Sequence, residues 1–158
     1  YERIMERLAG RKIHIVVDAT KDLLLNVLKY HPFLIKPNNH ELEELFGVTL
    51  KQEEDIIVYA RKLQEMGAVN VLISMAGDLT EDGKVYRKMP PKGNVVNSVG
   101  AGDSMVAGFL TGYLNTNNYE KALQLGIAAG SASAFLSWLA GKDEIVKLLQ
   151  QPPEEYGL

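Results

Sequence analysis

The chain has 158 residues and a net charge of −3, with 46% hydrophobic and 23% charged residues, a composition typical of a globular domain. We expect a single domain over residues 1–158, and this charge gives no reason to expect a nucleic acid or an anionic membrane as partner. The absence of cysteine excludes disulfides and thiolate metal sites, so cytoplasmic residence is the default expectation. We expect neither a membrane span nor a signal peptide.

The first half of the chain alternates helical spacing of apolar residues with short apolar runs. In chain order it predicts a helix stopped by Gly10, a strand over 13–17, a helix over 23–28 closed by Pro32, a strand over 33–35, a helix over 40–46 stopped by Gly47, a helix stopped by Gly67, and a strand over 69–73. A hairpin turning at Asp82-Gly83 is expected next, because this pair favours a type I′ turn.

The second half is predicted to be helical over 103–114, 119–136 and 142–150. Strands alternating with helices indicate a mostly parallel sheet covered by helices. Ligands of such sheets bind beyond the carboxyl ends of the strands. The polar residues expected at these ends are Asp18, Lys36, Asn38, Ser74 and the loop 97–103, which follows the short apolar run Val95-Val96.

The most informative stretch is Asn97-Ser98-Val99-Gly100-Ala101-Gly102-Asp103, directly before a predicted helix. The two glycines allow a sharp turn and a close approach of the backbone to a ligand. The unpaired N–H groups of a helix start attract a phosphate or a developing negative charge, and Asp103 adds a carboxylate that could accept a proton. The alternative is structural, since Asp is a common N-cap residue and glycine turns precede many helices. The dinucleotide fingerprint and the Walker loop are both excluded, because Met105 stands where a small residue is needed and no Gly-Lys-Ser/Thr string follows.

The second informative stretch is Lys36-Pro37-Asn38-Asn39-His40-Glu41. Asn38 suits a helix N-cap, and Glu41, three residues later, would complete a capping box. The functional interpretation places Asn38 and Glu41 near a hydrated Mg²⁺, which prefers oxygen ligands and keeps several waters. Lys36 would then lie close to nucleotide phosphates. Read alone, the stretch leaves both interpretations open.

Together these stretches resemble the ribokinase-like (PfkB) sugar kinases. Gly100-Ala101-Gly102-Asp103 is similar to that family's anion hole and catalytic base, and Asn38-Asn39-His40-Glu41 is similar to its Asn-x-x-Glu motif. The flanking residues and the run 128–132 most resemble the branch that contains 1-phosphofructokinase and tagatose-6-phosphate kinase. The resemblance implies a ribokinase-like three-layer α/β/α fold with a mostly parallel sheet and a small hairpin. Members are about twice this length, so it also implies a carboxy-terminal portion without the lid and the amino-terminal half.

The activity that the resemblance implies is ATP-dependent phosphorylation of a ketohexose phosphate, with fructose 1-phosphate first and tagatose 6-phosphate as the alternative. Asp103 would be the base, and Gly100, Ala101 and Gly102 would form the anion hole. A non-catalytic nucleotide-binding half-domain remains the alternative from another class of protein.

The resemblance also assigns cofactors, cations and partners. The residues it places at the nucleotide are Lys36, Asn38, Ser74, Gly77, Gly102, Ile127, Gly130 and Ser131, the last three on the adenine side. Asn38 and Glu41 would organise Mg²⁺ through water, and Asn97 and Val99 would take part in a site for a monovalent cation such as K⁺. The implied partners are a sugar phosphate and a second copy of the chain, joined through the absent lid.

Overall fold

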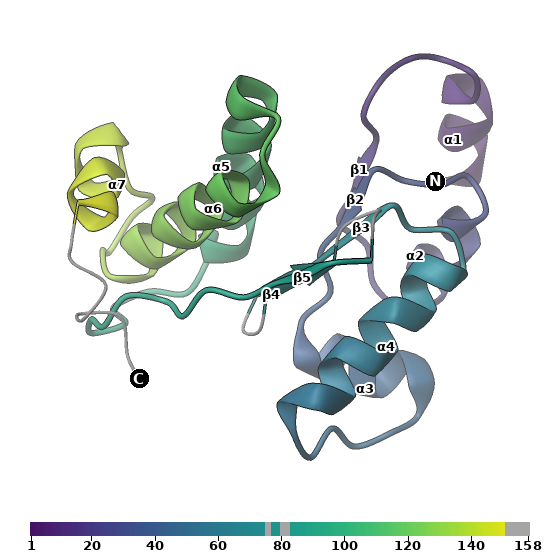
Figure 1. Ribbon diagram of the computed structural model, residues 1–158, viewed down its shortest axis with the longest axis horizontal. Helices are drawn as coiled ribbons and strands as arrows, with labels where there is room; N and C mark the ends of the chain where they lie inside the picture. The colour runs from purple at the N-terminus through teal and green to yellow at the C-terminus, as the bar shows by residue number, and fades with distance from the viewer. Residues whose placement is uncertain (75–76, 80–82, 151–158) are drawn as a thin grey trace. The chain divides into compact units, whose positions relative to one another are not determined.

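The computed structural model describes residues 1–74, 77–79 and 83–150 of the chain. It contains two compact units, Tyr1–Val85 and Tyr86–Leu158 (Figure 1). Among the described residues, the first unit carries most of the sheet with four helices, and the second carries three helices. Each unit has its own share of the predicted site residues, so the two are treated in turn.

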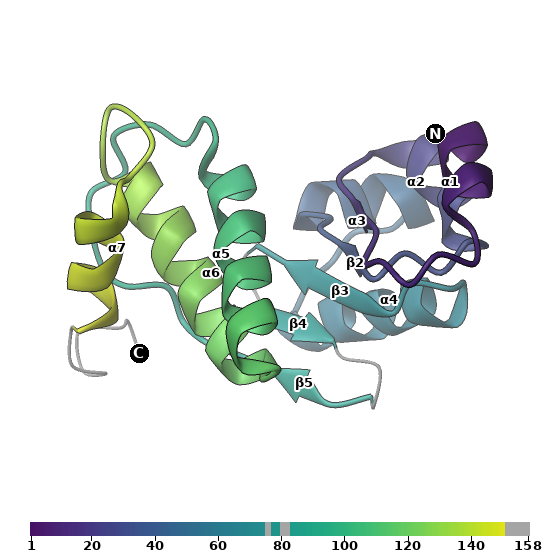
Figure 2. The same cartoon turned by 90° about the horizontal axis from the view of Figure 1, so that it is seen from above.

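Unit 1 combines short strands with helices α1 to α4. The helices are α1 (Glu2–Leu8), α2 (Lys21–Leu28), α3 (Asn39–Phe46) and α4 (Glu53–Glu65), and the strands are β1 (Val16–Val17), β2 (Leu34–Ile35), β3 (Asn70–Ile73) and β4 (Gly77–Leu79). Strands β1, β2 and β3 pair in parallel, whereas β4 runs antiparallel to β3 (Figure 2). The sheet order is β1-β2-β3-β4-β5, where β5 is Val85–Tyr86. The predicted α/β class, with a mostly parallel sheet and a small hairpin, is confirmed.

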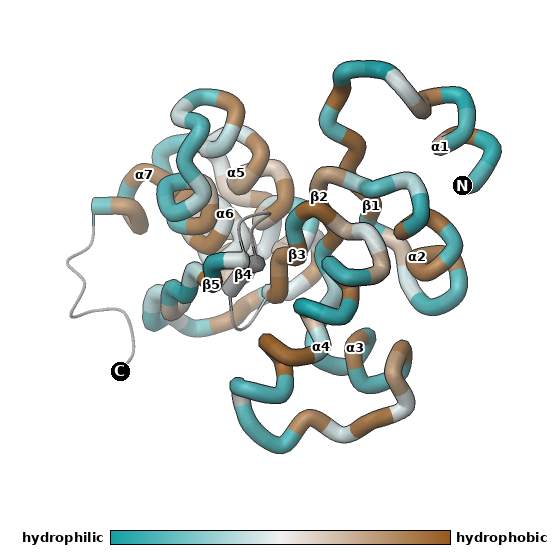
Figure 3. Tube along the Cα trace, turned by 45° about the vertical axis from the view of Figure 1, so that its right-hand side comes forward, coloured by the Kyte–Doolittle hydropathy of each residue, from teal (hydrophilic) through white to brown (hydrophobic). Residues whose placement is uncertain are grey.

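The core of unit 1 lies between one face of the sheet and helices α1 to α4. Ile35, Val71 and Ile73 belong to it, whereas the alternate residues Leu34 and Leu72 face the other way, because successive strand side chains point to opposite faces. The tube of β2 is accordingly hydrophobic throughout (Figure 3). The buried members of this core are Met5, Val17, Leu24, Val27, Leu28, Ile35, Leu42, Ile56, Ala60, Leu63, Ala68, Val71 and Ile73.

The strand predicted over 13–17 is shorter than expected. Only Val16 and Val17 pair with β2, and Ile13 is 52% exposed. Within the described residues β1 has β2 as its single neighbour, so it is an edge strand whose start no second strand covers. Of the turn predicted at Asp82-Gly83, Asp82 lies outside the described residues, and Gly83 has a left-handed φ of +75°.

Unit 2 is a pair of closely packed antiparallel helices with a third beside them. These are α5 (Ala101–Thr116), α6 (Tyr119–Ala134) and α7 (Lys142–Leu149). A Cβ added to Gly112 of α5 would lie 2.7 Å from Ala122 Cα, and one added to Gly126 of α6 would lie 2.9 Å from the Met105 carbonyl oxygen. Glycine therefore lets the two helix backbones approach more closely than any side chain would allow.

Each helix among the described residues is too short or too polar to span a lipid bilayer.

Candidate functional site

The start of α5 is set by Gly100. This residue is the N-cap, with φ +79° and ψ −4°, a left-handed conformation that glycine adopts without strain. Asp103 is consequently the third helical residue and makes no side-chain cap. The N-cap alternative for Asp103 is wrong, because the turn at Gly100 starts the helix earlier than expected.

In the described part of the chain, three backbone N–H groups at this helix start have no acceptor. The first helical bond runs from Ser104 N to Gly100 O at 2.9 Å, and Ala101 N donates to Ser98 O at 3.2 Å. Among the described residues nothing accepts a hydrogen bond from the N–H groups of Gly100, Gly102 or Asp103. The helix dipole adds about half a positive charge at this end, so the N–H groups form an environment that favours an anion.

The Asp103 carboxylate belongs to the same first turn of α5 as these N–H groups. Its side chain is exposed, and within the part of the chain that the structure describes it makes no ion pair or hydrogen bond. A carboxylate without a partner keeps its lone pairs available to accept a proton.

The loop before α5 is held by the end of α6 and not by a strand. Val96 N and Asn97 N both donate to Ala134 O, at 2.8 and 3.1 Å. The expectation that the loop follows a strand end is wrong, because these bonds take up the N–H groups that a sheet would have used. The Asn97 side chain closes the loop, as Oδ1 accepts from Val99 N at 3.0 Å and Nδ2 donates to Ser137 O at 3.2 Å.

Helix α6 touches the start of α5 through Gly130. A Cβ at this position would lie 3.0 Å from Ala101 O and 3.1 Å from Met105 Cβ. This close approach gives Gly130 a packing reason, and the contact of Gly126 with the Met105 carbonyl gives Gly126 one as well. Ile127 is 7% exposed and Ser131 is partly buried on the same helix; their placement on the adenine side stays a prediction.

We expect the Gly130→Ala and Gly112→Ala substitutions to separate site geometry from stability. At Gly130 the tight contact is partly offset by the gain in helix propensity, so stability should change by less than about 1 kcal/mol, while the first turn of α5 is displaced. At Gly112 the new methyl meets the Ala122 backbone at 2.7 Å, so stability should fall by roughly 1–3 kcal/mol. Urea unfolding measures the stability of both variants. Titration with ATP, the nucleotide that the family resemblance implies, measures the effect of the displaced first turn, which we expect for Gly130→Ala. Equal loss of ATP affinity in the two variants would contradict the prediction.

At the carboxyl edge of the sheet in unit 1, Asp18 and Lys36 follow directly after paired strands. Val17 is in register with Ile35, and Lys36 Nζ lies 3.8 Å from Asp18 Oδ2. The Lys36 side chain is only 11% exposed, so a partly desolvated ammonium stands at this edge. Sequence reasoning placed Asp18 there without assigning it a role.

Ser74 and Gly77 lie where β3 ends and β4 begins. Ser74 comes directly after β3 and is half-buried, and Gly77 pairs with Ile73 across the antiparallel ladder. Ser74 therefore lies at the same edge of the sheet as Lys36, which follows the neighbouring parallel strand.

The capping box at α3 is present. Asn38 Oδ1 accepts from Glu41 N at 2.9 Å, and Glu41 Oε2 accepts from Asn38 N at 2.8 Å. The helix ends at Gly47, with φ +62°, so both predicted ends are confirmed. The box uses one oxygen of the Glu41 carboxylate in this bond, and a carboxylate has a second oxygen with lone pairs to offer.

The side-chain oxygens of Asn38 and Glu41 fit a hydrated Mg²⁺. Among residues 1–74, 77–79 and 83–150 no three His, Asp or Glu side chains form a group that could enclose a metal ion. Mg²⁺ does not need such a group, because it keeps several waters and is bound through one or two carboxylates together with substrate phosphates.

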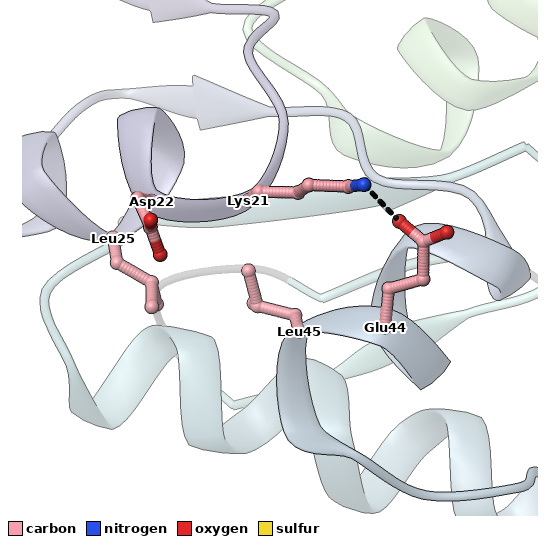
Figure 4. A pocket seen from close by; sticks show the side chains of 5 residues that line it. All are labelled: Lys21, Asp22, Leu25, Glu44 and Leu45. Carbon is pink, nitrogen blue, oxygen red and sulfur yellow. Dashed lines mark ion pairs between the residues drawn. The ribbon is translucent and has the colours of Figure 1, made fainter.

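An open pocket elsewhere in unit 1 contains none of the predicted site residues. It is lined by Lys21, Asp22, Leu25, Glu44 and Leu45, from α2 and α3 (Figure 4). Lys21 Nζ and Glu44 Oε2 pair at 3.3 Å, with side chains 68% and 56% exposed. An exposed ion pair of this kind contributes little free energy. Because Glu44 compensates Lys21 and Asp22 adds a negative charge, the pocket offers no uncompensated positive charge to a phosphate.

Comparison with known proteins identifies similar chains. Residues 5–137 match the family described as pfkB family carbohydrate kinase. The chain is 43% identical over 154 residues to 1-phosphofructokinase of Bacillus subtilis and 34% identical over 159 residues to D-tagatose-1-phosphate kinase of Bacillus licheniformis. Each alignment covers 96% of this chain and 51% of the relative, so the chain spans about half the length of these curated relatives.

A solved structure gives the same result for the fold. The crystal structure of phosphofructokinase-2 from Escherichia coli in complex with potassium superposes with a TM-score of 0.82 at 28% identity, over 93% of this chain and 50% of that one. The α/β arrangement of the described elements is therefore that of sugar kinases in this group.

Proposed function

The chain belongs to the pfkB family of carbohydrate kinases, and from this premise we propose that the protein transfers the γ-phosphoryl group of ATP to a hydroxyl of a ketohexose phosphate. The observation that carries the proposal is the start of α5. Its three unpaired N–H groups and the exposed carboxylate of Asp103 are the two elements that such a transfer needs, one for the charge and one for the proton.

In the proposed reaction Asp103 accepts the proton of the substrate hydroxyl. The hydroxyl oxygen then forms a bond to the γ-phosphorus, and the bond from that phosphorus to the β–γ bridging oxygen breaks, which releases ADP. The N–H groups of Gly100, Gly102 and Asp103 stabilise the charge on the transferring group. Ala101 contributes less than expected, because its N–H already donates to Ser98 O. Phosphoryl transfer depends mainly on positioning and on such electrostatic stabilisation.

The resemblance to the family assigns proposed nucleotide contacts to residues in each unit, taken separately. Lys36 offers a partly desolvated ammonium to phosphate oxygens, and a point charge of this kind is a common phosphate ligand. Asn38 and Glu41 would hold Mg²⁺ through its waters, and the ion would neutralise phosphate charge. The remaining proposed nucleotide contacts are Ser74, Gly77, Gly102, Ile127, Gly130 and Ser131.

A monovalent cation beside the anion hole is part of the proposal. Asn97 and Val99 would supply oxygen ligands from the loop that precedes Gly100. The Asn97 Oδ1 already accepts from Val99 N, so backbone carbonyl oxygens are the better candidates. The E. coli phosphofructokinase-2 complex with potassium supports a cation of this type in the group.

Fructose 1-phosphate is the first substrate we propose, because the B. subtilis relative at 43% identity is named 1-phosphofructokinase. The test is a panel of fructose 1-phosphate, tagatose 1-phosphate, tagatose 6-phosphate and fructose 6-phosphate, with kcat/KM measured on the protein at its natural length. We expect the highest kcat/KM with fructose 1-phosphate. This value should exceed that of its epimer, tagatose 1-phosphate, by about tenfold or more if one buried hydrogen bond distinguishes the two. A higher value with either tagatose phosphate would overturn the substrate assignment.

The panel also tests the alternative from another class of protein. That alternative is a non-catalytic nucleotide-binding role, and the chain spans about half the length of these relatives. ATP binding without turnover of any sugar phosphate would support that role. A homodimer joined through a lid, and residence in the cytoplasm, belong to the proposal for the full-length kinase.

A further inference from the structure

Ser133, near the end of α6, is a fully buried polar residue with two hydrogen-bond partners. It is 2% exposed. Its hydroxyl donates to Ser104 Oγ at 2.9 Å and accepts from Ala140 N at 3.1 Å. A buried hydroxyl that satisfies both its donor and an acceptor position offsets the cost of leaving water.

The two partners, Ser104 and Ala140, belong to two different segments that lie next to the loop 97–103. Ser104 follows Asp103 directly, and its backbone N–H makes the first helical hydrogen bond of α5. Ala140 ends the stretch Phe135–Ala140, here called the 135–140 segment, which links α6 to α7. Ser133 therefore ties this segment to the first turn of α5.

The 135–140 segment touches the loop at two further points, both near the surface. Ser137 O accepts from Asn97 Nδ2 in an exposed hydrogen bond of 3.2 Å. Leu139, 52% exposed, lies so close to Gly100 that a Cβ there would be 2.6 Å from Leu139 Cδ2. Water competes more strongly for the exposed bond than for the two part-buried bonds of Ser133, so the Ser133 contacts contribute most to holding the segment in place.

We propose that Ser133 is a positioning residue for phosphoryl transfer. By binding Ser104 and Ala140 together, it holds the 135–140 segment on the start of α5 and fixes the direction of the free N–H groups of Gly102 and Asp103. The inference rests on the proposed kinase function. A small displacement of such donors costs rate without costing the substrate its other contacts, so the effect belongs in kcat.

The test is Ser133→Ala in the protein at its natural length. The change leaves the Ala140 N–H without its acceptor and removes the hydrogen bond to the Ser104 side chain. We expect kcat to fall about tenfold, which corresponds to the free energy of one hydrogen bond. The KM for ATP should stay within about twofold, because the phosphate contacts made by other residues remain. Amide hydrogen exchange at Ala140 should become about tenfold faster or more.

Ser104→Ala and the double variant complete a cycle. Ser104 is only partly buried, so this variant removes the same hydrogen bond even if Ser133→Ala folds poorly. If Ser133 acts through Ser104, the kcat of the double variant should equal that of Ser133→Ala, whereas independent effects would multiply. Thr111→Ala is the matched control, since it deletes a hydroxyl of α5 that donates to Ala107 O at 2.8 Å and should leave kcat unchanged.

Each outcome decides the inference. A tenfold fall in kcat with faster Ala140 exchange supports it. Normal kcat in both Ser133→Ala and Ser104→Ala, while Asp103→Asn is inactive, overturns it and leaves the kinase function intact. A fall in kcat that Thr111→Ala reproduces also overturns it. A natural-length protein that turns over no sugar phosphate refutes the proposed function, and the positioning role fails with it.

Discussion

The Asp103→Asn variant is expected to lose turnover by a factor of about 10²–10⁴, the usual contribution of a general base. Asparagine has nearly the same shape but accepts no proton at neutral pH. The N–H groups of Gly100, Gly102 and Asp103 belong to the backbone and remain in place. ATP affinity should therefore stay within about twofold. Steady-state kinetics with the best sugar phosphate of the panel, and calorimetric titration with ATP, measure the two quantities separately.

Asp143→Asn is the matched control for this prediction. Asp143 is also an exposed acidic residue in the first turn of a helix, α7. Both substitutions remove one negative charge from a helix start, which costs about 0.3–1 kcal/mol of stability in each case. Full activity in Asp103→Asn would reject Asp103 as the base, and equal loss in both variants would point to stability as the cause.

Gly67→Ala is expected to cost the largest amount of folding free energy, roughly 2–5 kcal/mol by summing left-handed strain and overpacking. Gly67 has a φ of +131°, and a Cβ there would lie 2.1 Å from Leu28 O and 2.9 Å from Leu28 C. Both atoms belong to the end of α2, so no side-chain rotation relieves the clash. Helix α2 would have to move away from the turn that leads into β3.

The Gly47→Ala variant separates strain from collision. Gly47 ends α3 with a φ of +62°, and nothing lies within 4 Å of a Cβ added to it. Its substitution should cost only the left-handed strain, about 1–2 kcal/mol. Urea unfolding of both variants gives the difference in free energy. A Gly67→Ala protein as stable as Gly47→Ala would show that α2 and the turn separate without cost.

Elements whose ends are formed by neighbouring residues were predictable from sequence. Helix α3 begins at Asn38 and ends at Gly47 as expected, because the cap joins residues only three apart and the stop is a property of glycine itself. The loop Gly100–Asp103 was recognised for the same reason, since a glycine turn and a following helix are local. The family motifs lie within these local stretches, and residues 5–137 match the family they indicated.

The tertiary structure decided which groups at the candidate site are in use. Val96 and Asn97 donate to Ala134 instead of forming a strand, and Ser133 reaches Ser104 over 29 positions of sequence. Sequence spacing carries no signal for such pairs, because their partners are distant along the chain and any buried serine has the same local pattern. The sequence by itself therefore determined that a glycine-rich helix start with an acidic residue follows a capped Asn-x-x-Glu helix. Only the packing of α6 against α5 decided that Ala134 holds the loop before that start and that Ser133 bonds to Ser104.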